Sequence, residues 1–155
     1  MKSLWPFHQS THKTSTAKSC TGRYLPGGTT TCIVGKQSSQ VVNSGTNITG
    51  MGQFSWILLQ GKAERKILLL SVYQPYQTQN LGPYTVHAQQ SHILCQQGHT
   101  DPNPRRQCIK DLTEFIKQQI QRGHEIIVSI NTNEEIVSDN KIKPYNITDL
   151  IKKWD

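Results

Sequence analysis

The fold of this chain is decided by one stretch, His124-Glu125-Ile126-Ile127-Val128-Ser129-Ile130-Asn131-Thr132-Asn133-Glu134, in which an apolar run ends abruptly in amides and a carboxylate. The run is short, rich in β-branched residues and begins directly after Gly123, so it predicts a buried strand rather than a helix. The polar cluster then lies at the carboxyl end of a strand, where open α/β sheets hold their ligands. Asn131 places an amide where a catalytic carboxylate would be most useful.

Three other segments are predicted to be strands because they are short, apolar or β-branched, and bounded by turn residues: 29–34, 54–59 and 67–73. The last two are separated by a short polar loop that contains Gly61, which is typical of an antiparallel hairpin. Both are almost continuously apolar, so we expect them to be covered on both faces. Residues 43–52 are expected to form a loop, because glycines alternate there with Ser, Thr and Asn.

Helices are predicted on either side of the 124–134 stretch. One covers 88–97 and ends at Gly98. The main one starts at the prolines before Arg105 and is closed by Gly123 as its C′ residue. Its apolar stripe at helical spacing consists of Cys108, Ile109, Leu112, Phe115, Ile116 and Ile120. A last helix is predicted at 146–154, with Asn146 as its N-cap.

The 155-residue length is that of one ordinary domain, but only 34% of the residues are hydrophobic. The deficit lies mostly in the first fifty residues, and residues 7–18 contain almost no apolar side chain that could offset the entropy of ordering. We therefore expect residues 1–25 to be a flexible basic arm and residues 26–155 to be the globular domain.

The charge is one-sided. The formal net charge is +7, and no Asp or Glu precedes Glu64, whereas six Lys or Arg residues do. A field of one sign favours polyanions, of which nucleic acid is the commonest, although a merely soluble basic domain fits the composition equally well. DNA or RNA is the expected partner on the first interpretation.

The cysteines and the N-terminus bear on the compartment. The four cysteines form no C-x-x-C pair, the segment after Met1 is too short and Pro-broken for a signal peptide, and no stretch approaches membrane-spanning length. The expectation is an intracellular protein, nuclear or cytoplasmic, with reduced thiols and no membrane partner. The sequons at Asn47 and Asn146 are then chance matches.

Two strand ends carry the residues that could do chemistry. Tyr73 lies at the end of one strand, and Asn131 and Asn133 at the end of another. If the strands share a sheet and a direction, a phenol and two amides converge and can hydrogen-bond a phosphate, but they cannot activate water at neutral pH. The alternative is structural, with the tyrosine closing the core and the amides closing a turn.

A family resemblance rests on several motifs: Gly50-Met51-Gly52-Gln53-Phe54-Ser55-Trp56, the hairpin, the Tyr-x-Pro exit at Tyr73, the Pro-Arg-Arg-x-x-Ile-x-Asp-Leu helix from Pro104, and the closing strand. In these motifs the chain resembles the endonuclease/exonuclease/phosphatase superfamily, most of all the endonuclease domains of non-LTR retrotransposons. The resemblance implies a four-layer α/β sandwich, with two packed, mainly antiparallel sheets flanked by helices, that hydrolyses phosphodiesters with Mg²⁺.

The resemblance also implies roles for individual residues. Tyr73 matches the phosphate-contacting tyrosine and Asn133 the phosphate-positioning asparagine, whereas Asn131 stands where the family has the Asp that orients or deprotonates water. The family's metal-binding Glu would precede Pro26, and its closing Asp-His pair would follow Asp155. The sandwich is therefore expected to be incomplete.

The change at position 131 predicts loss of catalysis. Asn is nearly isosteric with Asp but accepts no proton and is a poor ligand for a hard cation. Loss of a general base alone lowers a rate by roughly 10²- to 10⁴-fold. We therefore expect neither bound Mg²⁺ nor metal-dependent cleavage.

Arg105 and Arg106, at the start of the main helix, are the candidate phosphate contacts outside the strand ends. They oppose the helix dipole there, which mildly favours a functional over a merely solvated role. A zinc site is a weaker hypothesis, because no standard ligand spacing is met by the cluster of His87, His92, Cys95, His99 and Cys108.

The sequence thus predicts a truncated or degenerate phosphodiesterase domain that has lost its activity. The alternatives are a non-catalytic module that binds nucleic acid, and an enzyme completed by flanking sequence or another chain. An incomplete sandwich would expose sheet edges, so self-association or poor solubility is expected for the isolated chain.

Overall fold

The chain has a mixed α/β fold in this computed structural model, which describes residues 10–15, 28–76, 82 and 84–132. The elements are β1 (Ser10–Ser15), β2 (Thr29–Val34), the 3₁₀ helix η1 (Gly35–Gln40), β3 (Val41–Thr46), β4 (Phe54–Gln60), β5 (Lys66–Tyr73), α1 (Val86–Gln96), α2 (Pro104–Gln121) and β6 (Glu125–Asn131). The predicted fold class, a mixture of helices and strands, is confirmed.

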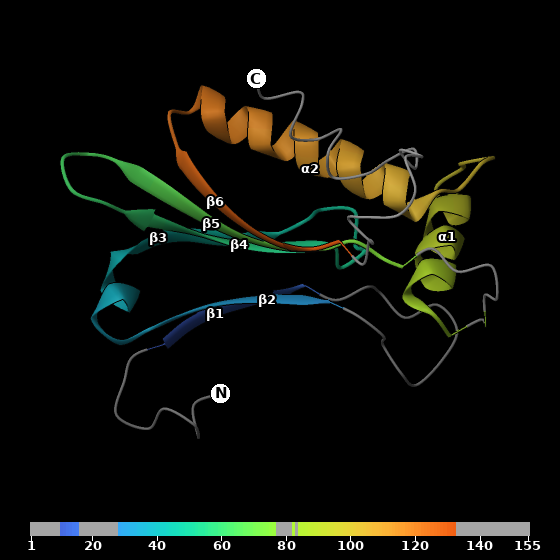
Figure 1. Cartoon of the computed structure of the whole chain (residues 1–155), viewed down its shortest axis with the longest axis horizontal. Helices are drawn as coiled ribbons and strands as arrows, with labels where there is room; N and C mark the ends of the chain where they lie inside the picture. Colours follow the sequence, from blue (N-terminus) through green and yellow to red (C-terminus); the bar gives the residue numbers. More distant parts are fainter. Residues whose placement is uncertain (1–9, 16–27, 77–81, 83, 133–155) are drawn as a thin grey trace, which may run out of the picture.

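The centre of the fold is a four-stranded sheet in the order β3-β4-β5-β6. The β3–β4 and β4–β5 pairs are antiparallel, and β5 and β6 are parallel. Parallel neighbours need a long connection, and here α1 and α2 provide it, with α2 lying across one face of the sheet (Figure 1).

The two-stranded ladder of β1 and β2 lies on the side of this sheet opposite α2 (Figure 1). A side-chain contact joins it to the sheet: Thr31 Oγ1 donates to Ser55 O at 3.0 Å and lies 2.9 Å from Ser55 Oγ. Both residues are buried, so this polar pair satisfies its own hydrogen-bonding groups away from water.

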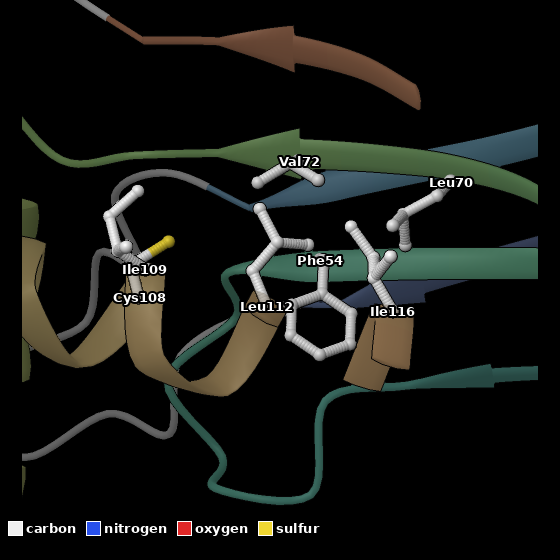
Figure 2. Packing of buried hydrophobic residues seen from close by; sticks show 7 residues of the cluster. All are labelled: Phe54, Leu70, Val72, Cys108, Ile109, Leu112 and Ile116. Atoms are coloured by element: carbon white, nitrogen blue, oxygen red, sulfur yellow. The ribbon is translucent and has the colours of Figure 1, made fainter. Parts of the chain in front are cut away.

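The main core lies between α2 and the sheet. Figure 2 shows the side chains that meet there, which are Phe54, Leu70 and Val72 from the strands and Cys108, Ile109, Leu112 and Ile116 from the helix. All are at most 7% exposed, and each large aliphatic side chain buried in this way contributes roughly 1.5–3 kcal/mol. Burial also raises the pKa of the Cys108 thiol to about 12, so that it packs as a neutral apolar group.

Most of the predicted helices and strands are confirmed, together with the capping residues that mark the helix ends. The hairpin of β4 and β5 is present, and β2 spans residues 29–34 as predicted. In α2, the Asn103 side chain accepts a hydrogen bond from Arg106 N, and Gly123 follows the helix with a φ of 75°. Thr85 caps α1 in the same way by accepting from Ala88 N.

Two segments differ from expectation. Residues 43–46, predicted to be loop, belong to β3, where Gly45 pairs with Trp56 of β4. A Cβ atom on Gly45 would lie 2.6 Å from the Trp56 ring, so this glycine makes room for the indole and does not mark a turn. Within the expected flexible arm, Ser10–Ser15 forms β1, because backbone pairing with β2 does not require apolar side chains.

Some predictions fall on other parts of the chain. The helix predicted at 146–154 and the site residue Asn133 lie outside the described residues. Within the described part, no helix has both the length and the apolar character needed to cross a membrane.

Candidate functional site

The candidate site lies at the carboxyl ends of β5 and β6. These strands are adjacent and parallel, and Tyr73 is paired in register with Asn131, the last residue of each strand. The pairing continues one residue further, since Gln74 N donates to Asn131 O at 2.9 Å. Tyr73 and Asn131 were expected to converge if their strands share a sheet and a direction, and both conditions are met. We call these two residues the rim.

The rim side chains project from the face of the sheet opposite α2. Val72 and Ile130, one position earlier on each strand, pack in the core beneath α2. Because successive side chains of a strand alternate between faces, Tyr73 and Asn131 lie on the side occupied by the β1–β2 ladder. Tyr73 is half-buried and Asn131 is exposed, so the rim is open to solvent at the β6 side.

Buried amides hold the strand end that carries Tyr73. Tyr73 N donates to Gln53 O at 2.8 Å, and Gln53 itself is fully buried. Its Nε2 donates to Gln90 Oε1 of α1 at 3.3 Å and to Pro104 O of α2 at 3.4 Å. Gln90 Nε2 in turn donates to Met51 O at 2.7 Å. This amide network therefore links both helices to the backbone beneath the rim.

Arg105 ties α2 to the exit of β5. Its side chain is buried and donates to Pro75 O at 2.8 Å and to Gln74 Oε1 at 3.1 Å. Hydrogen bonds from a charged donor are stronger than neutral ones, so these two contacts fix the segment that follows Tyr73. They give Arg105 a positioning role, and its contact with a phosphate stays a prediction.

Arg106, the next residue of α2, lies in a different environment. Its side chain is 50% exposed and its Nη1 lies 3.6 Å from Asp101 Oδ2. An exposed ion pair at this distance contributes little to stability. The first turn of α2 therefore brings one exposed cation to the same end of the sheet as the rim.

His87 of α1 lies in the field of Arg105. Burial, and secondly the charge of Arg105, lower the pKa of His87. Its Nδ1 is 3.4 Å from Ser91 Oγ, one turn along the same helix. The folded protein therefore favours the neutral imidazole, which avoids a second positive charge beside Arg105.

The residues considered for zinc are spread over different environments. His92 contacts Gln96, Cys95 is exposed, and Cys108 is in the core between α2 and the sheet. Across the described ranges, no group of three or more His, Cys, Asp or Glu side chains is placed to hold a metal ion.

The rim also does not fit Mg²⁺. This cation prefers carboxylate and phosphate oxygens in near-octahedral geometry. Tyr73, Gln74 and Asn131 offer a phenol and amides, with no carboxylate among them.

The sequence pointed to the rim but missed the amide network. The available signal was Gln89-Gln90 within α1, one helical turn before the apolar pair Ile93 and Leu94. Both glutamines are at most 1% exposed. Buried amides at helical spacing from apolar residues indicate an internal polar network rather than a solvated face.

Comparisons of this chain with protein-family models, curated proteins and solved structures found no match.

Proposed function

We propose that this chain is a degenerate phosphodiesterase domain of the endonuclease/exonuclease/phosphatase type, similar to the endonuclease domains of non-LTR retrotransposons, that binds nucleic acid without cleaving it. The observation that carries the proposal is the pairing of Tyr73 with Asn131 at the ends of two parallel strands. On this proposal, the β3–β6 sheet and the β1–β2 ladder correspond to the two sheets of an incomplete four-layer sandwich.

Phosphate binding at the rim is supported by the donors available there. Tyr73 and Asn131 carry a phenol O–H and an amide N–H₂ that can donate, and Arg106 carries an exposed cation at the same end of the sheet. The amino end of α2, which carries the partial positive charge of the helix, lies at the same end of the sheet, where Arg105 contacts Pro75 O. The net charge of +7 adds a long-range attraction for a polyanion.

The absence of hydrolysis follows from the same donor set. Neither amide nor phenol is a base at neutral pH, and the rim lacks the carboxylates that Mg²⁺ requires. Asn131 can donate a hydrogen bond where the enzymes that this chain resembles hold a carboxylate, which favours holding a phosphate oxygen over activating a water molecule.

Fluorescence anisotropy with a labelled DNA oligonucleotide tests the binding. Tyr73→Phe removes the rim hydroxyl and is expected to weaken binding severalfold, because solvent at the open rim reduces the roughly 1.5–3 kcal/mol that a hydrogen bond to a charged group contributes. Tyr84→Phe, at a tyrosine that is 62% exposed, is the matched control and should bind like the wild type. Equal affinity for all three proteins would overturn the assignment of the rim.

A second pair of variants tests the cation near the rim. Arg106→Ala, at the start of α2, should weaken binding and reduce the salt dependence by about one counterion. Arg122→Ala removes the same charge just after the other end of α2 and should have little effect. If both variants weaken binding equally, only the net charge matters and no local site exists.

Incubation of purified protein with supercoiled plasmid and Mg²⁺ tests the loss of catalysis. We expect no nicking above the background seen with EDTA. Nicking that copurifies with the protein, requires Mg²⁺ and disappears in the Tyr73→Phe variant would show an active enzyme and contradict the proposal.

A further inference from the structure

The two edges of the four-stranded sheet differ in how well they are protected. At one edge, the pairing of β3 with β4 is shifted by an irregularity between Val41 and Asn43, and a glycine follows at position 45. Bulges of this kind twist an edge strand away from potential partners. At the other edge, β6 pairs with β5 in unbroken register over all seven residues. Among the described residues, nothing pairs with the outer side of β6.

The outer side of β6 also lacks the usual protective residues. Its sequence, Glu-Ile-Ile-Val-Ser-Ile-Asn, contains no Pro, Gly or Lys, and its one charged side chain, Glu125, forms an ion pair with Arg65. Ile127 is 58% exposed and Val128 is 40% exposed. A regular, β-branched edge with exposed apolar side chains is a surface that accepts another strand.

The hydrogen bond from Gln74 N to Asn131 O shows which backbone groups face outward. In an extended strand, the N–H and C=O of one residue point to the same side, and the side alternates along the chain. Since Asn131 O points to β5, the groups of residues 125, 127 and 129 also point to β5. The outward groups belong to Ile126, Val128 and Ile130.

These three residues read the same in both directions, as Ile-x-Val-x-Ile. If a second β6 is laid antiparallel with Val128 opposite Val128, each Ile126 lies opposite Ile130 of the other copy. Each of these pairs exchanges two N–H···O=C bonds and places apolar side chains together on the α2 face. Glu125 then lies opposite Asn131, whereas parallel pairing in register would place Glu125 opposite Glu125.

We propose that β6 pairs antiparallel with β6 of a second copy of this chain, centred on Val128, and joins two four-stranded sheets into one. A two-fold axis perpendicular to the sheet relates the copies, so both α2 helices lie on the same face. The two rims lie at opposite ends of the paired strands, about 20 Å apart along the strand direction. This assembly does not depend on the proposed function, because its outward backbone groups belong to Ile126, Val128 and Ile130 and not to the rim.

Sedimentation velocity over a range of protein concentrations tests the proposal with a matched pair of variants. Val128→Lys places a charge at the centre of the pairing and should raise the dimer dissociation constant roughly tenfold or more. Val42→Lys makes the same change at a 52% exposed valine on the other edge strand and should leave the dimer intact. A wild-type protein that is monomeric at all concentrations would refute the proposal, as would a dimer lost only in Val42→Lys.

Cysteine cross-linking tests the register and remains informative if Val128→Lys does not fold. Val128→Cys should form a disulfide between two copies at residue 128 after mild oxidation, since paired residues have Cα atoms about 5.5 Å apart. Val42→Cys should not link to itself, and peptide mapping separates these links from those of the native cysteines. Protection of β6 from hydrogen exchange in a monomer without the 128–128 link would mean that residues 133–155 cover the edge, which would overturn the second-copy assignment.

Discussion

Two neighbouring glutamines in α1 illustrate how differently buried amides contribute. Gln90 donates to Met51 O and accepts from Gln53, whereas both amide atoms of Gln89 are buried without a partner in the described part of the chain. An unsatisfied buried polar group costs about 1–3 kcal/mol, and a satisfied one leaves its partners unpaired when it is removed.

The same substitution at the two sites should therefore have opposite effects. Gln89→Leu is expected to raise the free energy of unfolding by about 1 kcal/mol, and Gln90→Leu to lower it by about 2 kcal/mol. Urea unfolding followed by circular dichroism measures both. A loss of stability in Gln89→Leu comparable to that in Gln90→Leu would mean that Gln89 has an essential partner.

His87 makes stability depend on pH. Because burial and then Arg105 lower its pKa below the usual 6.5, the unfolded chain binds more protons than the folded protein as the pH falls through that value. Stability should therefore be fully present above about pH 6.5 and decrease as the solution is acidified. His124, whose pKa is lowered chiefly by burial, adds to the same trend.

Comparison of two histidine variants of α1 isolates this contribution. His87→Gln should reduce the loss of stability between about pH 7.5 and pH 5.5, since the group that resists protonation is gone. His92→Gln, at an exposed histidine on the same helix, should retain the wild-type pH dependence. Identical pH profiles for both variants would contradict the assigned role of His87.

At the residue scale, the sequence predicted the rim residues better than the buried residues that hold them in place. Tyr73 and Asn131 could be identified because they follow apolar runs that end abruptly. Gln53 could not, because an isolated glutamine looks the same whether it is solvated or buried in a network, and the only signal for Gln90 was its helical spacing to Leu94. The burial of Arg105 was also missed, since it depends on contacts to residues 74 and 75 that only the tertiary fold creates.

The turn between β4 and β5 is a strained element that can be improved. Ala63 and Glu64 have φ values of 53° and 62°, and Arg65 N donates to Lys62 O at 3.2 Å. Two consecutive residues in the left-handed conformation define a type I′ turn. This turn favours Asn-Gly, because most residues other than Gly, Asn and Asp are disfavoured in the left-handed conformation.

Replacing this turn with its preferred residues should stabilise the hairpin. Ala63→Asn combined with Glu64→Gly is expected to raise the free energy of unfolding by about 1 kcal/mol. Lys62→Gly, at the neighbouring position that is not left-handed, should lower stability by about 0.5 kcal/mol through the greater entropy of the unfolded chain. Thermal unfolding compares the two, and stabilisation by Lys62→Gly as well would point to charge rather than backbone conformation.

At the element scale, strands and helices with an apolar pattern were predicted, and those without one were not. In β5 and α2, apolar residues recur at strand or helix spacing, and turn or capping residues stand at the ends. The residues that pack in the core therefore also reveal these two elements in the sequence. β3 has the sequence Val-Val-Asn-Ser-Gly-Thr, whose polar half resembles a loop. It becomes a strand because β4 offers backbone partners and the Trp56 ring needs the space over Gly45.

The charge of the whole molecule should give its two proposed interactions opposite salt dependence. Each copy carries a net charge of +7, so two copies repel, and added salt should strengthen self-association through β6. Binding to DNA releases counterions and should weaken with salt. Sedimentation and anisotropy at about 50 and 200 mM salt measure the two trends. Self-association that weakens with salt would point to ionic contacts instead of strand pairing.

The central claim is that Asn131 lies where a nucleic-acid phosphate binds. The most direct test is the DNA affinity of Asn131→Asp, measured without Mg²⁺, beside Asn43→Asp, which makes the same charge change on the exposed β3 edge. A carboxylate at the rim should repel the phosphate and weaken binding roughly tenfold, whereas the change at Asn43 should matter less than about twofold. Equal effects of the two substitutions, or none, would contradict the account.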